Sequence, residues 1–321
     1  MYAIVVHGGA GSWPPERERE ITYGVRVAAE AGRDLLAAGH SALEAVTAAV
    51  RALEDDPLFN AGTGSTLSLP GSVEMDAGVM WGPEQATGNV AALPRVRNPV
   101  LVARAVMERS DHALLAGPGA LRFARSLGHA DYDPVTAAAR NRWSRLRARL
   151  EDNPGEFGRL SGLLRDHPDL DGDTVGAVAV DGRGALAAAT STGGVALKLP
   201  GRVGDSPLPG CGHYADDRCA VGATGQGELM MRHGTARVTA CRVGAGESLH
   251  EAVTGALDDL GRHLGSEVGI IGVDAAGEPV IAHRTPHMPH AVALEGTEEI
   301  HSALARTSGA EDASPGPPAP A

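Results

Sequence analysis

Aromatic residues and cysteines are scarce in this chain of 321 residues. Only 3 Trp, 4 Tyr and 3 Phe are present, so a hydrophobic core has to be built mainly from Ala, Val and Leu. The three cysteines, Cys211, Cys219 and Cys241, are an odd number and show no CxxC spacing. This usage argues against a disulfide framework and favours reduced thiols in a cytoplasmic protein.

Positive charge and long apolar runs are also missing. The chain has 28 Lys and Arg against 40 Asp and Glu, a net charge of −12, which argues against nucleic acid or an anionic membrane surface as the main partner. No stretch approaches the roughly 18 consecutive apolar residues of a membrane-spanning helix. The N-terminus has no basic cluster and reaches His7 too early for a secretory signal peptide. We therefore expect a cytoplasmic protein with neither a membrane nor a nucleic-acid partner.

Glycine, by contrast, is abundant. Its 43 residues are about twice the usual share and have no collagen-like period, which predicts many tight turns and close backbone approaches. The apolar content of 43% is sufficient for a sizeable core. At about 150 residues per domain, the length allows two domains or one large α/β sandwich.

The first half of the chain predicts a strand and several helices. The sequence AIVVHGGAG reads as a buried strand that runs into a glycine turn. Ser41 and Glu44 form a capping-box pattern for one helix, and Asn98 before a proline predicts the cap of another. We expect helices over residues 15–38, 41–53, 99–109, 120–126 and 134–150.

The second half begins with a change of character. Residues 151–173 are acidic and interrupted by Gly and Pro, which predicts an exposed linker. TVGAVAV, the turn DGRG and ALAAATS then predict a hairpin covered on both faces. We expect a single helix after the strand and turn of CAVGATGQGE, a helix over residues 248–264 and a closing hairpin over 268–284, whereas residues 306–321 are typical of a disordered tail.

Two possible metal motifs are incomplete. The acidic run that ends at Asp173 begins like a calcium loop, but Thr174 stands where that loop requires glycine. His283, His287 and His290 have ligand-like spacing, yet intervening prolines prevent one helix from presenting all three. A GxSxG nucleophile elbow and a P-loop are also absent.

The remaining candidates for chemistry are polar, glycine-containing segments, of which the linker boundary is the most informative. Thr174 begins a buried strand directly after the linker. A threonine made N-terminal by chain cleavage carries its own base, because its α-amino group has a pKa of about 7.7–8.0. Its hydroxyl could then attack an amide carbonyl, and a backbone N–H such as that of Gly225 could stabilise the oxyanion. Arg202 and Asp205 could bind the carboxylate and the ammonium of an amino acid. In the alternative interpretation, Thr174 is an ordinary strand residue and the Arg–Asp pair is a weak surface ion pair.

Five segments stand out by their order along the chain: HGGAG (7–11), LEDDPLFNAGTGS (53–65), DTVGAVAVDGRGALAAATSTGG (173–194), GRVGDSPLPG (201–210) and TGQGE (224–228). Together they resemble the isoaspartyl peptidase and plant-type L-asparaginase family of N-terminal-nucleophile hydrolases. The resemblance implies a four-layered αββα sandwich, made as one precursor that cleaves itself between Asp173 and Thr174. Residues 1–173 would become an α chain and residues 174–321 a β chain of one sandwich domain, and two αβ units would pair as a homodimer.

The resemblance also implies roles for individual residues. Thr174 would be the nucleophile, Thr192 would assist it, Thr224 and Gly225 would form the oxyanion hole, and Asn60 would help to hold the nucleophile. The substrate zwitterion would be bound by Arg202, Asp205, Gly225 and Gly227. No cofactor is needed for catalysis, but the family binds a structural Na+ through backbone carbonyls, which here would belong to Leu53, Glu54, Asp56, Phe59, Ala61 and Thr63.

Several positions depart from the family pattern. Many relatives have Gly before the nucleophile, whereas Asp173 matches the related glycosylasparaginases and could assist cleavage of its own bond. Asp56, Cys211 and His213 also differ, and His213 is a candidate for lining the pocket. The segment HRTPHMPHA departs as well, so no substrate contact can be carried over to it.

The sequence thus predicts an autoprocessed amidohydrolase that releases L-aspartate from L-asparagine and from β-aspartyl dipeptides. The alternative enzyme is a glycosylasparaginase-like amidase, which Asp173 favours. The alternative from another class is an uncleaved protein that binds small amino acids. Retention of the three hydroxyls of Thr174, Thr192 and Thr224 disfavours this last alternative, because a binding protein needs no such set.

Overall fold

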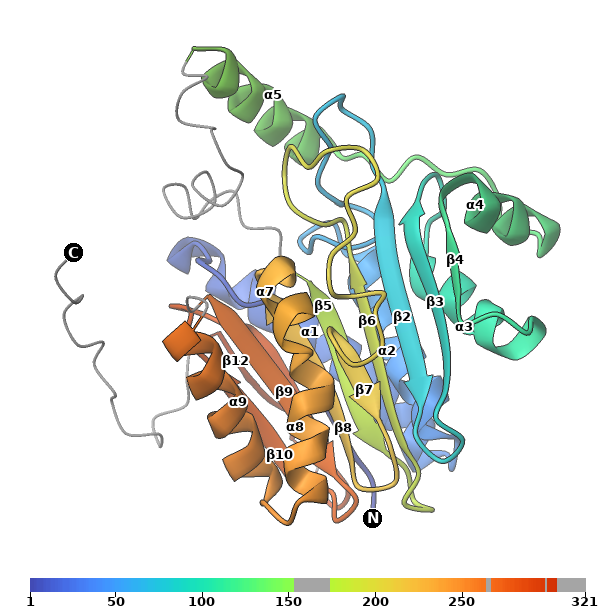
Figure 1. The fold of residues 1–321 in the computed structure, drawn as a ribbon, viewed down its shortest axis with the longest axis vertical. Coiled ribbons are helices and arrows are strands. Elements are labelled where there is room, and N and C mark those ends of the chain that lie inside the picture. Colours follow the sequence, from blue (N-terminus) through green and yellow to red (C-terminus); the bar gives the residue numbers. More distant parts are fainter. Residues whose placement is uncertain (153–173, 264–266, 298, 305–321) are drawn as a thin grey trace, which may run out of the picture.

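The computed structural model describes residues 1–152, 174–263, 267–297 and 299–304 (Figure 1). The expected linker and the expected C-terminal tail lie almost wholly outside these residues. One boundary of the linker was wrong, because helix α5 continues to Asp152 and so includes the first two residues assigned to the linker.

Twelve named strands form two sheets in the described residues. The larger sheet has the order β12-β11-β1-β5-β6-β2-β3-β4, and the smaller one has the order β10-β9-β8-β7. The larger sheet consists of β1 (Ala3–His7), β2 (Met75–Trp81), β3 (Ala86–Leu93), β4 (Leu114–Ala116), β5 (Val175–Val180), β6 (Leu186–Thr192), β11 (His290–Leu294) and β12 (His301–Ala303). The smaller sheet consists of β7 (His213–Ala215), β8 (Cys219–Gly225), β9 (Val268–Asp274) and β10 (Pro279–His283).

Helices pack against both sheets. Figure 1 shows α8 and α9 in front of the smaller sheet and α1 and α2 behind the larger one. The helical segments are η1 (Pro15–Arg17), α1 (Glu18–Ala37), α2 (Ala42–Asp55), α3 (Pro99–Arg109), α4 (Gly117–Ser126), α5 (Ala137–Asp152), α7 (Gly227–His233), α8 (Thr235–Gly244) and α9 (Leu249–His263). The protein is thus of mixed α/β class.

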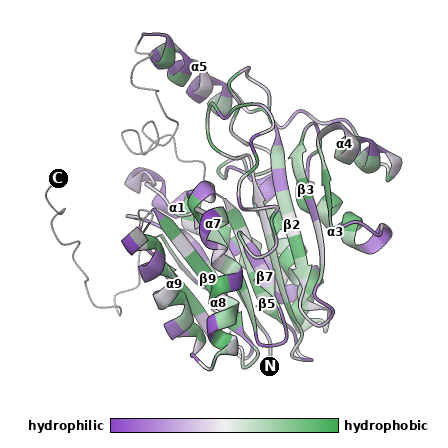
Figure 2. Ribbon diagram, in the orientation of Figure 1, coloured by the Kyte–Doolittle hydropathy of each residue, from purple (hydrophilic) through white to green (hydrophobic). Residues whose placement is uncertain are grey.

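Strand β5 shows why the expected hairpin is apolar on both faces. Its side chains alternate, so that Ala177 and Ala179 pack in the core with α1 and α2, whereas Val178 and Val180 pack in the core with the smaller sheet. Figure 2 shows β5 and β2, two strands of the larger sheet, largely in the green of hydrophobic residues. The strand that follows Thr174 is therefore fixed from both sides.

The sequence predicted most helix boundaries, with two corrections. The capping box at the start of α2 is confirmed, since Ser41 and Glu44 exchange side-chain to backbone hydrogen bonds. The single helix expected after β8 is wrong, because Gly234 takes φ +69° and separates α7 from α8. Asn98 precedes α3 as expected, but its side chain does not cap the helix and instead donates to Asp55 at 3.2 Å.

Candidate active site

Thr174 lies directly before β5 and is 3% exposed. Two hydroxyl groups from elsewhere in the chain reach it. Thr224, near the end of β8 in the smaller sheet, donates its Oγ1 hydrogen to the Thr174 carbonyl oxygen at 3.3 Å. Ser206 donates its hydroxyl to Thr174 Oγ1 at 3.5 Å. The candidate nucleophile is therefore held where the two sheets face each other.

Thr224 is itself held by the N-terminal glycine segment. The backbone N–H of Ala10 donates to Thr224 Oγ1 at 3.3 Å. A hydroxyl that accepts this bond directs its own hydrogen toward Thr174. The HGGAG sequence thus orients a hydroxyl group next to the candidate nucleophile, Thr174.

Thr192 and Asn60 approach the nucleophile through the turn that follows β6. Antiparallel pairing of Val175 with Ser191 brings Thr192 opposite Thr174. The Thr192 hydroxyl accepts the N–H of Gly194 at 2.9 Å, and Asn60 donates to the Gly194 carbonyl at 2.8 Å. Asn60 therefore holds the turn that carries Thr192, and among the described residues its side chain forms hydrogen bonds with Gly194 and Thr66 rather than with Thr174.

Arg202 and Asp205, the predicted clamp for the carboxylate and ammonium groups of an amino acid, both lie next to Gly227. A Cβ atom added to Gly227 would lie 2.7 Å from Asp205 Oδ1 and 3.2 Å from Arg202 Nη2, so both side-chain heads face this glycine. Arg202 is already paired with both carboxylate oxygens of Glu228, at 2.9 and 2.8 Å. A substrate carboxylate would have to share this guanidinium group with Glu228 or displace it.

Asp205 has the electrostatics of a site for an ammonium ion. The residue is 3% exposed, and its Oδ2 atom has no hydrogen-bond partner among the described residues. Burial raises the pKa of Asp205 to about 7, against the opposing effect of the nearby Arg202. A buried carboxylate oxygen without a donor is costly, and a bound ammonium group would satisfy it.

Gly225 ends β8 with φ +124°, a backbone conformation that favours glycine. A side chain there would overlap the carbonyl oxygen of Glu267, the residue directly before the neighbouring strand β9. Gly225 lies next in sequence to Thr224 and opens the turn that leads to α7. Its N–H is a candidate oxyanion donor beside the Thr224 hydroxyl.

Comparisons with known proteins identify the family of this chain. A family model described as asparaginase matches residues 1–302. The chain belongs to the asparaginase family. The plant-type L-asparaginases of Pyrococcus abyssi and Thermococcus kodakarensis are 44% and 45% identical to it over 302 and 304 residues, and each alignment covers 93% of this chain and 98% of the relative. The isoaspartyl peptidase/L-asparaginase of Rattus norvegicus is 42% identical over 295 residues, covering 91% of this chain and 86% of that protein.

Ser206 is a further residue of the candidate site in this asparaginase-family chain, and the sequence interpretation missed it. Ser206 donates a hydrogen bond to Thr174, the candidate nucleophile, and its carbonyl oxygen accepts hydrogen bonds from Thr190 Oγ1 at 2.8 Å and from the His213 ring at 2.9 Å. Burial lowers the pKa of His213 to about 4, so its ring is neutral and donates through Nδ1. His213 thus lies behind Ser206. The position of Ser206 directly after Asp205 was a signal for this role.

Asp76 and Lys198 are two further buried groups that support the clamp. Asp76 accepts the backbone N–H of Gly204 at 3.3 Å and that of Ala92 at 2.7 Å, which ties the GRVGD loop to the larger sheet. Lys198 donates to the carbonyl of Glu74 at 2.6 Å. Burial raises the pKa of Asp76 and lowers that of Lys198, while each partly offsets the other. Their spacing in the sequence gave no indication that these two buried charges influence each other.

The loop expected to bind Na+ is closed by its own backbone. The Glu54 carbonyl accepts the N–H of Thr63 at 2.8 Å, and the carbonyls of Leu53 and Asp56 accept N–H groups at 3.3 and 3.2 Å. Each carbonyl oxygen keeps a second lone pair, so this donor set suits a hard cation. The Glu54 side chain points elsewhere, since its carboxyl group accepts the Ser191 hydroxyl at 2.6 Å.

Side-chain metal ligands do not gather elsewhere in the part of the chain that the structure describes. No group of three or more His, Cys, Asp or Glu residues is placed there to hold a metal ion, so His283, His287 and His290 form no such site. Among the described helices, none combines the length and apolar character needed to cross a membrane.

Proposed function

We propose that this chain is an autoprocessed amidohydrolase that releases L-aspartate from L-asparagine and from β-aspartyl dipeptides. The observation that carries the proposal is the position of Thr174, buried between the Thr224 and Ser206 hydroxyls at the head of β5. The relatives named plant-type L-asparaginase and isoaspartyl peptidase/L-asparaginase support the same substrates.

Self-cleavage would come first. The Thr174 hydroxyl attacks the carbonyl carbon of Asp173, the Asp173–Thr174 amide becomes an ester, and water hydrolyses that ester. The products are a free carboxylate on Asp173 and a free α-amino group on Thr174. Asp173 itself lies outside the described residues. The freed amine has a pKa near neutrality and can serve as the general base.

Substrate would then bind by its zwitterion. Arg202 binds the α-carboxylate, while Asp205 and the Gly227 carbonyl bind the α-ammonium group. The orphaned Oδ2 atom of Asp205 supports this assignment, because a cation supplies the missing hydrogen-bond donor. Asparagine and β-aspartyl dipeptides share this zwitterion and differ only in the group attached to the side-chain carbonyl.

The chemical steps require no further residue as base. The Thr174 amine takes the hydroxyl proton as Oγ1 attacks the side-chain carbonyl, and the Thr224 hydroxyl and Gly225 N–H stabilise the oxyanion. The amine then protonates the leaving ammonia or amino acid as the C–N bond breaks. Water hydrolyses the aspartyl ester and regenerates Thr174.

The larger organisation is part of the same proposal. The two sheets, with helices packed on each, support a four-layered αββα sandwich of the N-terminal-nucleophile type. We also propose that two αβ units pair, that Na+ binds the carbonyls of residues 53–63, and that the enzyme acts in the cytoplasm.

An assay of aspartate release tests this function. Wild-type protein should release aspartate from L-asparagine and from a β-aspartyl dipeptide, and Thr174→Ala should release none. Thr254→Ala is a matched control, because Thr254 is an exposed residue of helix α9 and does not line the site. Hydrolysis of a glycosylated asparagine with little activity on β-aspartyl dipeptides would instead support the glycosylasparaginase-like alternative. Aspartate binding without turnover would support a binding protein.

A further inference from the structure

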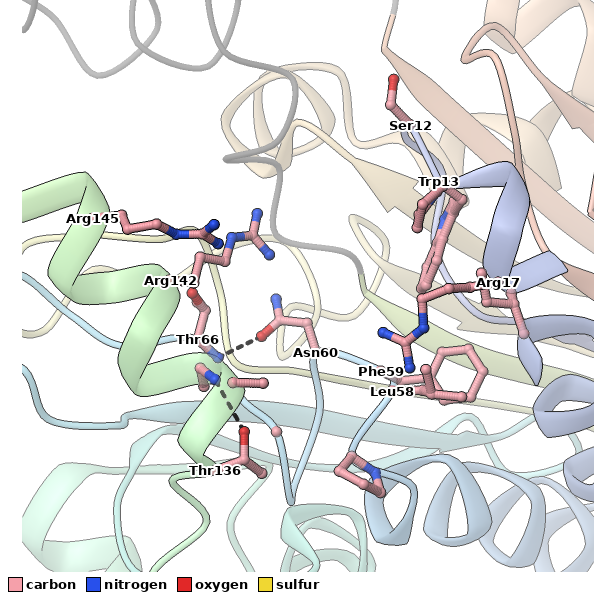
Figure 3. A pocket seen from close by; sticks show the side chains of 16 residues that line it. Ser12, Trp13, Arg17, Leu58, Phe59, Asn60, Thr66, Thr136, Arg142 and Arg145 are labelled. Carbon is pink, nitrogen blue, oxygen red and sulfur yellow. Dashed lines mark hydrogen bonds between the residues drawn. The ribbon is translucent and has the colours of Figure 1, made fainter. Parts of the chain in front are cut away.

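A cavity of about 620 Å³ lies between η1, the loop after α2 and helix α5. Figure 3 shows its side chains, with Trp13 and Phe59 on one side and α5 on the other. Its volume falls within the range of about 300–1,000 Å³ that is typical of small-molecule sites. Arg202, Asp205 and Thr174 are not among its lining residues, so this cavity is separate from the amino-acid clamp.

Both walls of the cavity contain residues from segments that also hold the surroundings of Thr174. On one side, Ser12 follows Ala10 by two residues, and Ala10 donates to the Thr224 hydroxyl that contacts Thr174. On the other side, Asn60 lines the cavity and also holds the turn that carries Thr192. Both walls therefore belong to segments that also hold the surroundings of Thr174, whereas the clamp residues Arg202 and Asp205 do not line the cavity.

The cavity is rich in positive charge, in contrast to the rest of the chain. The guanidinium groups of Arg142 and Arg145 extend from α5 toward Asn60, and that of Arg17 points to the same space from the opposite side (Figure 3). None of the described residues that line the cavity is acidic, although the chain as a whole has 40 acidic and 28 basic residues. Arg17 also forms an ion pair with the exposed residue Glu20, with 3.0 Å between Arg17 Nη2 and Glu20 Oε2. Such a concentration of arginine favours a carboxylate ligand.

We propose that this cavity receives the leaving amino acid of a β-aspartyl dipeptide and that its arginines bind the free α-carboxylate of that amino acid. The inference rests on the proposed function and names the part of the substrate that the clamp leaves unbound. The aspartyl zwitterion occupies Arg202 and Asp205, so the second amino acid must extend from the scissile amide into another compartment. Ammonia, which leaves from L-asparagine, has no carboxylate and gains nothing from the arginines.

Paired substrates test this inference. β-Aspartyl-alanine and its C-terminal amide differ only in the carboxylate that the arginines would bind. We expect wild-type kcat/KM to favour the carboxylate form by about 10-fold, a magnitude suited to charge-assisted hydrogen bonds at a partly exposed site. In the double variant Arg142→Gln/Arg145→Gln this preference should fall to near unity. Arg122→Gln, on the exposed side of α4 and outside the cavity, should keep the wild-type preference.

A second variant covers the opposite wall. Arg17→Gln should also reduce the preference for the carboxylate form, whereas its matched control Arg19→Gln, at a position that does not line the cavity, should not. This pair keeps the test decisive if substitutions on α5 impair folding. An unchanged preference in both cavity variants, or an equal loss on the carboxylate and amide substrates, would overturn the inference.

Hydrolysis of L-asparagine separates this inference from the proposed function. A wild-type protein that hydrolyses L-asparagine and both dipeptides with no preference contradicts only the carboxylate site. A wild-type protein that hydrolyses none of these substrates contradicts the proposed function itself.

Discussion

Replacement of Asp205 by Asn should weaken substrate binding and, at the same time, stabilise the fold. The side chain is 3% exposed, and its Oδ2 atom has no hydrogen-bond partner among the described residues. In the proposed complex, this carboxylate binds the substrate ammonium. Loss of one partner of a buried charge pair costs about 2–3 kcal/mol, which corresponds to a roughly 30–150-fold lower kcat/KM for L-asparagine.

The stability of the substrate-free protein should change in the opposite direction. Burial raises the pKa of Asp205 from 3.8 to about 7, which corresponds to about 4 kcal/mol of unfavourable ionisation as an upper limit. An Asn amide still needs partners for its N–H groups, so we expect a net gain of about 1–3 kcal/mol. The unfolded carboxyl ionises before the folded one does. Wild-type stability therefore falls as pH rises from about 4 to about 7, and the full loss is present above pH 7.

Denaturant unfolding in a Thr174→Ala background would measure this effect, because the uncleaved chain unfolds as one molecule. Asp205→Asn should raise the free energy of unfolding at pH 8 and leave it nearly unchanged at pH 4. Asp181→Asn is a control that should instead lower the free energy of unfolding. The Asp181 carboxylate accepts the backbone N–H groups of Ala42, Arg183 and Ala185, and the amide would lose some of these hydrogen bonds. Unchanged or lower stability of Asp205→Asn at pH 8, or an unchanged kcat/KM, would refute the reasoning.

Three further substitutions test the surroundings of the nucleophile. Ser206→Ala removes the hydroxyl that donates to Thr174 at 3.5 Å and should lower kcat about 3–10-fold with little change in KM, which steady-state kinetics across pH would measure. Gly227→Ala would place a methyl group 2.7 Å from Asp205 Oδ1 and should raise KM at least about 10-fold, whereas a KM within twofold of wild type would contradict the clamp. Glu54→Gln should stabilise the protein more at pH 9 than at pH 5. Burial raises the pKa of Glu54 to about 8, so the folded wild type has to ionise a buried carboxyl group at pH 9, whereas the amide has no charge at either pH. Melting temperatures of both proteins at the two pH values would measure this difference, and equal shifts at pH 5 and pH 9 would contradict the prediction.

Local patterns in the sequence predicted much of the fold. The capping box at Ser41 and Glu44 is confirmed because both partners belong to one helical turn. The hairpin of β5 and β6 is confirmed because side chains apolar on both faces require cover on both sides. The break at Gly234 was not predicted, since an isolated glycine within a helical pattern is compatible both with a continuous helix and with a left-handed end.

The site was predictable only in part, because its contacts join distant segments. Motif resemblance named Arg202 and Asp205, and the structure places both side-chain heads against Gly227. The pairing of Arg202 with Glu228 spans 26 residues, and Ser206 reaches Thr174 across 32. No local spacing encodes such contacts, since they depend on how the loops fold over the two sheets.

Asn98 shows a similar limit on a smaller scale. Its place before Pro99 was correct for a helix start, yet a tertiary partner, Asp55, takes its side-chain amide. A propensity for capping is weak compared with an available charged acceptor on a neighbouring helix.

The intact mass of the purified protein after warm incubation tests the central claim most directly. We expect two chains for the wild type, residues 1–173 and residues 174–321, with Thr174 at the new N-terminus. Thr174→Ala should remain a single chain under the same conditions. A wild-type chain that stays whole, or one cut at another bond, would leave the Thr174 hydroxyl without its own amine as base and would contradict the account.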